Sequence, residues 1–317
     1  MKNLSEMKYI LAPMAEYTDL PFRRACRLSG LYYAHTALID AGALAHGNPD
    51  SDTILKRGEE EKYLAVQLLG SIPEDIQKAA KILNKMDFDS VDFNMGCPVK
   101  KVLQRKAGAA LMLLPEQALE CLKKIRDIIS GPLTVKTRIL SEIDPEPTIS
   151  FCQALEACGI QGLTIHGRLA EKFYSGPVAF DIIRAIRENL KIPVTANGGI
   201  FNLKDAEELA QKTGCAQLMV ARGAIGNPWI FRELIQQNPT KPTHQEICAT
   251  MRQHVSDMIT LYGEQRGLIK ARKIILSYLV GRQYRRRLRA EAVHISTQED
   301  FINFYNAVKE EGPVPTR

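Results

Sequence analysis

Ser90-Val91-Asp92-Phe93-Asn94-Met95-Gly96-Cys97-Pro98 decides the fold, because a hydrophobic run ends here in a turn that carries a cysteine. The run from Ser90 to Phe93 predicts a buried β-strand. Gly96 lets the backbone turn without steric cost, and Pro98 removes a hydrogen-bond donor and stops the strand. We therefore expect Cys97 on a rigid turn at the C-terminal end of a strand.

Cys97 has two interpretations. Cysteine is among the most buried residue types and often only packs. An unperturbed thiol has a pKa of about 8.5, so at neutral pH it is mostly protonated and can donate a proton. The Gly-Cys-Pro bracket and the following pair Lys100-Lys101 favour the chemical interpretation.

Seven other β-rich runs accompany this one. In chain order the eight runs begin at Tyr9, Tyr33, Tyr63, Ser90, Leu133, Gly162, Pro193 and Gln217. From the fourth run to the eighth, each gap carries one helical pattern, which is typical of parallel βα units. The sequence therefore predicts an α/β fold, a (β/α)8 TIM barrel.

The pattern changes after Trp229. Residues 237–242, Gln-Asn-Pro-Thr-Lys-Pro, form a turn-rich linker. Three helical patterns follow, at Gln245–Tyr262, Leu268–Val280 and Gln298–Lys309. We therefore expect a barrel over residues 1–236 and a small helical C-terminal domain over residues 243–317.

The net charge of +6 is concentrated near the C-terminus. Residues 241–317 hold 13 Lys and Arg against 8 Asp and Glu, a net charge of +5, whereas the first 240 residues carry +1. An arginine cluster follows the second predicted helix, at Arg282, Arg285, Arg286, Arg287 and Arg289. Such a cluster suits a polyanionic partner, although a solvated helix face would also explain it.

Composition excludes several classes of protein. Seven cysteines without regular spacing argue against a disulfide framework and favour a reducing cytoplasm. No Cys or His pair has the spacing of a metal site, so we expect no metal. No apolar run is long enough to span a bilayer and no signal-peptide pattern begins the chain, so we expect a cytoplasmic protein without a membrane partner.

The active site of such a barrel lies at the C-terminal ends of its strands. The glycine turns after the last two predicted strands are where barrels bind phosphate, and Arg222 adds a charged contact. An inward Lys136 suits a cofactor that becomes anionic on reduction, and Gln67 can both donate and accept at an imide edge. His166 has a second interpretation, as a histidine at a strand end whose ring nitrogens are hydrogen-bonded within the protein. Together with the thiol, this set fits flavin mononucleotide (FMN) better than a phosphosugar.

The sequence resembles the tRNA-dihydrouridine synthases over nearly the whole chain. The matching motifs are Ala12-Pro13-Met14, Thr18–Arg23, Val66-Gln67-Leu68, Asp92–Pro98, Val135–Arg138, Ile165–Arg168, Tyr174-Ser175-Gly176, Asn197–Ile200, Arg222-Gly223-Ala224 and Asn227-Pro228-Trp229. Asn-Met-Gly-Cys-Pro followed by two lysines is specific for that family, and the pattern is most similar to its bacterial B-type subgroup. The positions that depart from the family pattern are Ala221, Gly199 (where Asp is common), Glu16-Tyr17 and Ile274.

The resemblance implies a flavoprotein oxidoreductase that reduces a D-loop uridine of tRNA, at position 17 for the B-type subgroup, to 5,6-dihydrouridine. The reductant would be NADPH or NADH, Cys97 would be the proton donor, and we expect a monomer. FMN would be held by Pro13, Met14, Ala15, Gln67, Lys136, His166, Asn197, Gly198, Gly199, Ala221 and Arg222. RNA or its uridine would be contacted by Asn94, Lys100, Lys101, Arg138, Arg168, Arg272, Lys273, Arg282, Arg285, Arg286 and Arg287.

Two other functions remain open. One is a flavin barrel similar to dihydroorotate or dihydropyrimidine dehydrogenases, which acts on a free pyrimidine and does not need the arginine cluster. The other is a non-catalytic RNA-binding barrel, which would carry no flavin. Oxidation of the reduced enzyme by tRNA or by free base separates the first from a synthase, and the colour of the protein separates the second.

Overall fold

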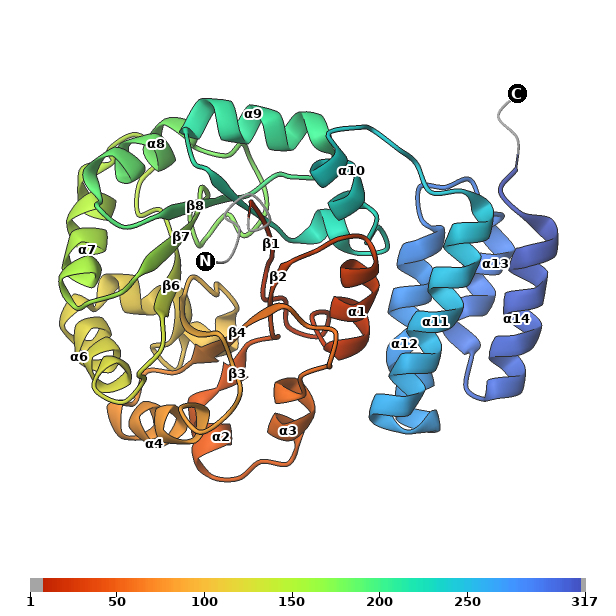
Figure 1. Cartoon of the computed structure of the whole chain (residues 1–317), viewed down its shortest axis with the longest axis horizontal. Helices are drawn as coiled ribbons and strands as arrows, with labels where there is room; N and C mark the ends of the chain where they lie inside the picture. The colour runs from red at the N-terminus through yellow and green to blue at the C-terminus, as the bar shows by residue number, and fades with distance from the viewer. Residues whose placement is uncertain (1–7, 315–317) are drawn as a thin grey trace.

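A computed structural model describes residues 8–314 of the chain, and parallel strands form a closed barrel in it (Figure 1). β1 pairs with both β2 and β9, and β2 pairs with β4, which closes the ring. A two-residue strand, β3 (Ile39–Asp40), adds to β4 beside it. The eight strands of the ring are β1 (Tyr9–Leu11), β2 (Tyr33–His35), β4 (Tyr63–Leu69), β5 (Ser90–Met95), β6 (Leu133–Arg138), β7 (Gly162–His166), β8 (Val194–Asn197) and β9 (Gln217–Val220). The predicted (β/α)8 barrel is confirmed.

Helices surround the ring, and several of them begin where the sequence supplies an N-cap residue or an early proline. α1 follows Asp19, whose side chain accepts from the backbone N–H of Phe22, as an N-cap should. The helices packed around the barrel are α1 (Leu20–Leu28), α4 (Pro73–Leu83), α6 (Pro115–Arg126), α7 (Glu146–Ala157), α8 (Phe180–Asn189), α9 (Leu203–Thr213) and α10 (Ile230–Gln236). Shorter helical pieces are α2 (Ala41–Ala45), α3 (Asp50–Leu55), α5 (Lys100–Leu103), η2 (Gly108–Leu113) and η3 (Arg222–Ala224).

The strand register gives the barrel a polar interior near its C-terminal end. Successive side chains of a strand point to opposite faces, and residues in register share a face. Gln67 is in register with Asp92, and Asn94 with Lys136. Phe93, between Asp92 and Asn94 in sequence, instead packs in the large core beneath the helices. Polar groups from neighbouring strands therefore meet inside the barrel, directly below the expected site.

Four helices form a bundle at one side of the barrel (Figure 1). They are α11 (His244–Tyr262), α12 (Glu264–Leu279), α13 (Arg286–Glu291) and α14 (Gln298–Glu311), with η4 (Ala292–His294) between the last two. α11 packs on α1, where Tyr262 Oη donates to Asp19 Oδ2 over 2.8 Å and Arg24 pairs with Asp257 at 3.0 Å. Barrel and bundle share one continuous apolar cluster.

The structure differs from the sequence prediction in its short elements. The run from Tyr33 to Ile39 is split, because residues 36–38 separate β2 from β3. α2, α3 and α13 were not predicted, since helices of five or six residues hold less than two turns of periodic pattern. Within residues 8–314, the helices are too short or too polar to cross a bilayer.

Candidate active site

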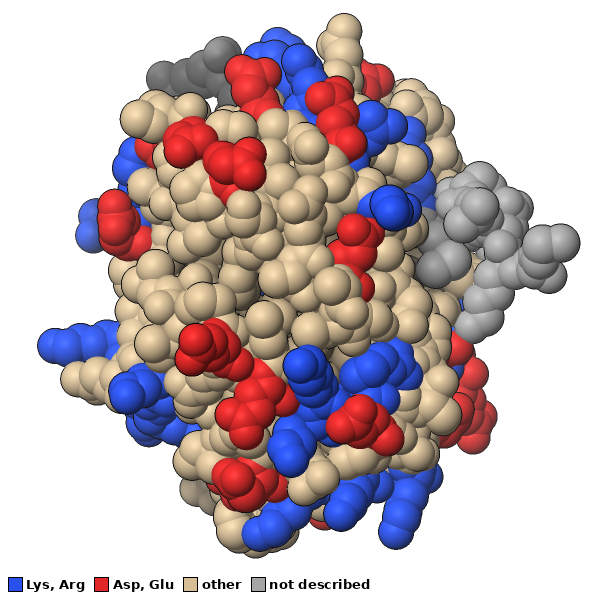
Figure 2. Space-filling view, turned by 90° about the vertical axis from the view of Figure 1, so that its left-hand side faces the viewer, with Lys and Arg blue, Asp and Glu red and all other residues tan. Residues whose placement is uncertain are grey.

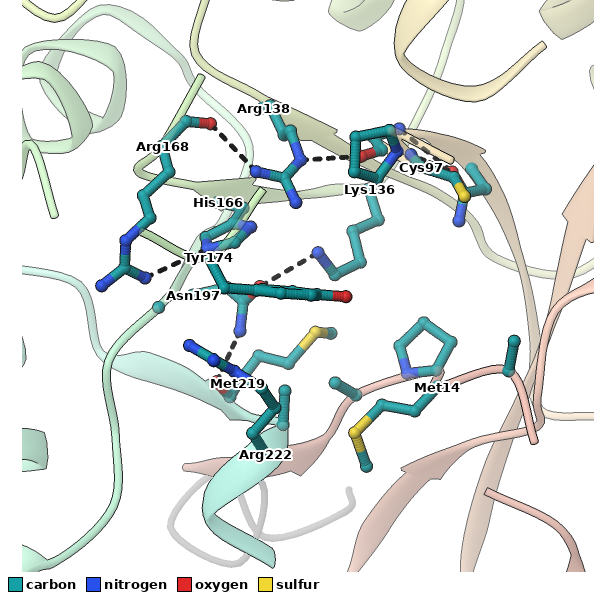
Figure 3. A pocket seen from close by; sticks show the side chains of 18 of the residues that line it. Met14, Cys97, Lys136, Arg138, His166, Arg168, Tyr174, Asn197, Met219 and Arg222 are labelled. Carbon is teal, nitrogen blue, oxygen red and sulfur yellow. Dashed lines mark hydrogen bonds between the residues drawn. The ribbon is translucent and has the colours of Figure 1, made fainter. Parts of the chain in front are cut away.

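A cavity of about 370 Å³ opens at the C-terminal ends of the strands. This volume lies within the range of cofactor and ligand sites. Met14, Lys136, Asn197 and Met219 surround it in Figure 3. Its charged lining residues are Lys136, Arg138, Arg168 and Arg222, and no Asp or Glu lies among the described residues that line it. The cavity therefore favours an anionic ligand.

Cys97 lies at one edge of the cavity, on the turn after β5. Its backbone N–H and that of Gly96 both donate to Asn94 Oδ1, each over 3.0 Å. Its carbonyl oxygen accepts from the backbone N–H of Ala109, also over 3.0 Å. The turn is thus tied down on both sides, and the residue remains partly exposed. The predicted rigid turn at a strand end is present.

Asn94 is held in turn by residues deeper in the barrel. Its Nδ2 donates to Gln67 Oε1 over 2.7 Å, and Gln67 Nε2 donates to Asp92 Oδ2 over 2.7 Å. Gln67 is fully buried and does not line the cavity. Its predicted contact with a cofactor stays a prediction, and its polar atoms are engaged by protein.

Lys136 extends from β6 across the cavity toward β8 (Figure 3). Its Nζ donates to Asn197 Oδ1 over 3.0 Å, and Asn197 Nδ2 donates to the carbonyl of Met219 over 2.8 Å. Burial, helped by the nearby charge of Arg138, lowers the pKa of Lys136 to about 8. Lys136 is therefore a cation at neutral pH that a modest rise in pH neutralises.

The turn after β8 requires glycine. Gly198 and Gly199 have φ angles of 132° and 75°, which side-chain-bearing residues rarely adopt. A Cβ at Gly198 would lie 3.1 Å from both His166 Cδ2 and Val178 Cγ2. Within residues 8–314 the backbone N–H groups of both glycines meet no acceptor. These two free amides line the same cavity as the Arg222 guanidinium, and this combination of donors suits a phosphate.

Two arginines fix the loops around the cavity. Arg138 is buried, and its Nε donates to the carbonyl of Gly96 over 2.8 Å while its Nη1 donates to that of Phe173 over 2.9 Å. Arg168 Nε donates to the carbonyl of Gly176 over 2.9 Å. Arg138 thus ties the Cys97 turn to the loop between β7 and α8.

His166 is neutral in this environment. Burial, together with the charges of Lys136 and the three cavity arginines, holds the pKa of His166 far below its usual value. Arg168 Nη1 lies 3.4 Å from His166 Nε2, and since a guanidinium can only donate, Nε2 accepts. His166 therefore supplies no acid at neutral pH.

Comparison with known proteins identifies the family. The family model for dihydrouridine synthases matches residues 10–311. The chain belongs to the dihydrouridine synthase family. A tRNA-dihydrouridine synthase B from Pasteurella multocida is 34% identical over 281 residues, covering 87% of this chain and 85% of that one. The corresponding protein from Shewanella oneidensis is 34% identical over 304 residues, covering 93% and 94%.

Solved structures show the same fold in more distant proteins. A 2-naphthoyl-CoA reductase aligns with a TM-score of 0.54 at 13% identity, over 73% of this chain and 50% of that one. A histamine dehydrogenase from Rhizobium sp. 4-9 aligns with a TM-score of 0.52, also at 13% identity, over 78% and 49%.

Dihydrouridine synthases are flavin-dependent oxidoreductases, and the cavity fits such a cofactor. The free amides of Gly198 and Gly199 with Arg222 suit its phosphate, and Lys136 suits a ring that gains negative charge. Met14 and Met219 give apolar walls. Within residues 8–314, no group of three or more His, Cys, Asp or Glu side chains is placed to hold a metal ion.

The residues predicted for this dihydrouridine synthase fall into two groups. The cavity is lined by Pro13, Met14, Ala15, Asn94, Cys97, Lys136, Arg138, His166, Arg168, Asn197, Gly198, Gly199, Ala221 and Arg222. Outside it lie Gln67, Lys100, Lys101, Arg272, Lys273, Arg282, Arg285, Arg286 and Arg287.

Several of the predicted RNA contacts are engaged within the protein. Arg272 Nε donates to the carbonyl of Ile295 over 2.7 Å. Lys273 pairs with Glu16 at 3.0 Å. Arg282 donates to the carbonyl of Tyr278 over 3.0 Å. Their contacts with RNA stay predictions.

Tyr174, Phe201 and Met219 also line the cavity, and the sequence did not predict them there. Tyr174 and Phe201 lie on loops after β7 and β8, and Arg222 stacks over both rings, 4.4 Å and 5.5 Å from their centroids. Met219 is on β9, in register with Asn197. For Tyr174 and Phe201, the available sequence signal was an aromatic residue in a loop that follows a strand. For Met219, it was the alternation of inward and outward residues along β9.

Proposed function

We propose that this protein reduces a D-loop uridine of tRNA to 5,6-dihydrouridine, using FMN and a nicotinamide reductant, NADPH or NADH. One observation carries the proposal: a partly exposed cysteine lies at the edge of a cationic cavity that contains a glycine phosphate cradle. The names of the curated relatives support tRNA as the substrate and dihydrouridine as the product. By resemblance to the B-type subgroup, we assign position 17.

The reaction adds two hydrogens across the C5–C6 double bond of uracil. The flavin, when bound, supplies the hydride, which arrives at C6. Cys97 donates its proton to C5, so the thiol becomes a thiolate and regains a proton from solvent. Asn94 and the turn amides hold Cys97 in place, and Arg138 fixes the turn from the other side. A positioned acid contributes about 10²–10⁴-fold to such a step.

His166 and Arg168 are the candidates for holding the uracil edge and the RNA backbone. The uridine lies within folded RNA, so it must leave its stack to enter the cavity. The neutral His166 has a ring N–H for a carbonyl oxygen, while the cation of Arg168 suits a phosphate.

The helical segment, residues 243–317, is proposed as the tRNA-binding domain, with the barrel over 1–236 as the catalytic domain. The arginines at 285–287, with the exposed pair Lys100-Lys101, would contact phosphates. We propose that the protein acts on tRNA in the cytoplasm, as a monomer.

Dihydrouridine formation can be tested directly. The purified protein is incubated with FMN, NADPH or NADH, and tRNA transcribed without modifications, and the nucleosides are analysed by mass spectrometry. We expect a gain of two hydrogens at position 17 and flavin release as FMN on denaturation. Transcripts with cytidine at position 17 are the matched control. Oxidation of the reduced enzyme by free uracil or orotate, with no dihydrouridine in RNA, would establish the free-pyrimidine dehydrogenase instead.

A further inference from the structure

Asp92 is an acid buried in the barrel with no role in the reaction proposed above. Its side chain lies on the inward face of β5 and the residue has 0% exposure. A buried carboxylate is retained only where hydrogen bonds replace water. Asp92 has two such bonds from protein side chains: Oδ2 accepts from Gln67 Nε2 over 2.7 Å, and Oδ1 accepts from Thr134 Oγ1 over 2.5 Å.

From Asp92 a chain of hydrogen bonds leads to the turn that carries Cys97. Gln67 Oε1 accepts from Asn94 Nδ2 over 2.7 Å. Asn94 Oδ1 accepts from the backbone N–H groups of Gly96 and Cys97, each over 3.0 Å. Two amide side chains therefore connect a carboxylate at one end with two backbone donors at the other.

The direction of this chain is fixed at both ends. Both side-chain oxygens of Asp92 accept hydrogen bonds, from Gln67 Nε2 and Thr134 Oγ1, so the amide of Gln67 turns its NH2 group toward Asp92 and its oxygen toward Asn94. Backbone N–H groups only donate, so Asn94 must turn its oxygen toward the Cys97 turn. Reversing either amide would bring two oxygens or two N–H groups face to face, and in a buried site each mismatch is costly.

We propose that Asp92 is a positioning residue, which orients the Cys97 turn through Gln67 and Asn94. This inference rests on the proposed function only in that the turn carries the proton donor. Asp92 does not line the cavity. It acts by fixing which atom of Asn94 meets the turn, and hence where the thiol lies at the edge of the cavity.

Exchanging the acid and the amide tests the direction of the chain. In Asn94→Asp, carboxylates lie on both sides of Gln67, whose amide can satisfy only one of them. In the double variant Asp92→Asn/Asn94→Asp, the amide of Gln67 can reverse. It then accepts from the new amide at position 92 and donates to the new carboxylate at position 94, which still accepts from the turn. The prediction is that the second substitution repairs the first.

The readout is hydrogen exchange at the backbone amides of residues 95–97, with the amides of β9 as an internal reference. Asn94→Asp should speed exchange in the turn by at least about threefold, and the double variant should return it to within about twofold of the parent, as for directly coupled residues. Additive damage, with the double variant as fast as Asn94→Asp or faster, would overturn the proposal.

A second pair of variants tests the proposal if the first pair does not fold. If Asn94→Asp fails to fold, a folded double variant supports the proposal. If both fail, Gln67→Glu and Gln67→Glu/Asp92→Asn decide, since the amide introduced at position 92 can donate to the carboxylate introduced at position 67 while Asn94 stays in place. The proposal then requires that Asp92→Asn raises the thermal midpoint of the Gln67→Glu protein, and a further fall would contradict it.

Activity is measured separately so that the two proposals can fail independently. The pre-reduced proteins are mixed with tRNA, and flavin oxidation is followed by absorbance. The rate should fall in Asn94→Asp and recover in the double variant by at least about threefold. If tRNA does not oxidise even the parent protein, the proposed function fails, whereas the exchange measurement still decides the role of Asp92.

Discussion

At the scale of single residues, Cys97 differs from the other cysteines in its surroundings. Burial raises the pKa of Cys121 and Cys152 to about 12, so these thiols stay protonated and pack in the core. Cys97 is instead partly exposed, lines the cavity and sits on a turn held from two sides. It is the cysteine that a substrate in the cavity can reach.

Replacing Cys97 removes the proposed proton donor while leaving the rest of the site. Cys97→Ala should keep FMN, bind tRNA and accept hydride from the nicotinamide, yet oxidise its reduced flavin with tRNA at least about a hundredfold more slowly. Stopped-flow absorbance of the pre-reduced protein measures this. Cys97→Ser, which replaces the thiol by a hydroxyl of similar size but weaker acidity, serves as the matched control. An alanine variant that reacted at the parent rate would make Cys97 a packing residue.

The charge of Lys136 predicts a pH dependence. With a pKa of about 8, the ammonium is present below that pH and disappears as the pH rises through it. Its neutralisation removes the cation that would stabilise negative charge on a reduced ring. The rate of flavin reduction by nicotinamide should therefore fall as the pH rises through this pKa. In Lys136→Met the rate should be low and flat over the same range, and a parallel fall in both proteins would assign the effect to another group.

At the scale of elements, the loop between β7 and α8 depends on one buried arginine. Arg138 donates to the carbonyls of Gly96 and Phe173, and its charge lies where solvent hardly reaches. Hydrogen bonds to a charged group are stronger than neutral ones, and a buried donor must have its acceptors placed for it. The Cys97 turn and the β7–α8 loop are thus mechanically coupled.

Removing Arg138 should loosen both segments. Arg138→Ala should lower the free energy of unfolding by about 1.5–3 kcal/mol, as for removal of a charge-assisted hydrogen bond, measured by urea denaturation. Hydrogen exchange should accelerate at residues 95–97 and at residues 168–176 together. Arg126→Ala is the matched control, because Arg126 also donates to a backbone carbonyl, that of Gly131, but at the exposed end of α6. Acceleration in only one segment would contradict the coupling.

The alternation of strands and helices was sufficient to predict the barrel, because each βα unit carries its own periodic pattern. β4, β6 and β9 begin at the residues that the sequence indicated, Tyr63, Leu133 and Gln217. Strand ends also predicted the cationic lining, since parallel strands bring their C-terminal ends to one side. The hydrogen-bond chain from Asp92 could not be predicted. It requires the register of Gln67 with Asp92 between β4 and β5, which periodicity within one strand does not determine.

At the scale of the whole molecule, the basic side chains differ in whether a neighbouring carboxylate already neutralises their charge, and so in how much charge they offer to RNA. The side of the barrel shown in Figure 2 carries acidic and basic side chains intermingled. In the arginine cluster, Arg287 pairs with Glu291 and Glu311, and Arg285 lies 3.7 Å from Glu311. Within residues 8–314 the guanidinium of Arg286 has no such partner. The cluster therefore offers less free charge than its sequence indicates.

Salt dependence of tRNA binding should distinguish these arginines. Removing one protein–phosphate interaction reduces the slope of log affinity against log salt by about 0.7–0.9. Arg286→Ala should approach that value, and Arg285→Ala should fall short of it, because Glu311 already neutralises part of its charge. Arg184→Ala, on α8 across the barrel from α13 (Figure 1), is the control and should leave the slope unchanged. Equal slopes for parent and Arg286→Ala would exclude this cluster from the interface.

Because the barrel and the bundle share one continuous core, the two parts should stay together when the chain between them is cut. Phe22 of α1 packs edge-on against His254 of α11, and Trp229 against Tyr278 of α12, with ring centroids 5.9 Å and 5.8 Å apart. A peptide bond in the segment between α10 and α11 is therefore not what keeps the two parts together. Fragments 1–240 and 241–317, expressed in the same cell, should assemble and co-elute on gel filtration, whereas the second fragment alone, with its apolar face uncovered, should aggregate.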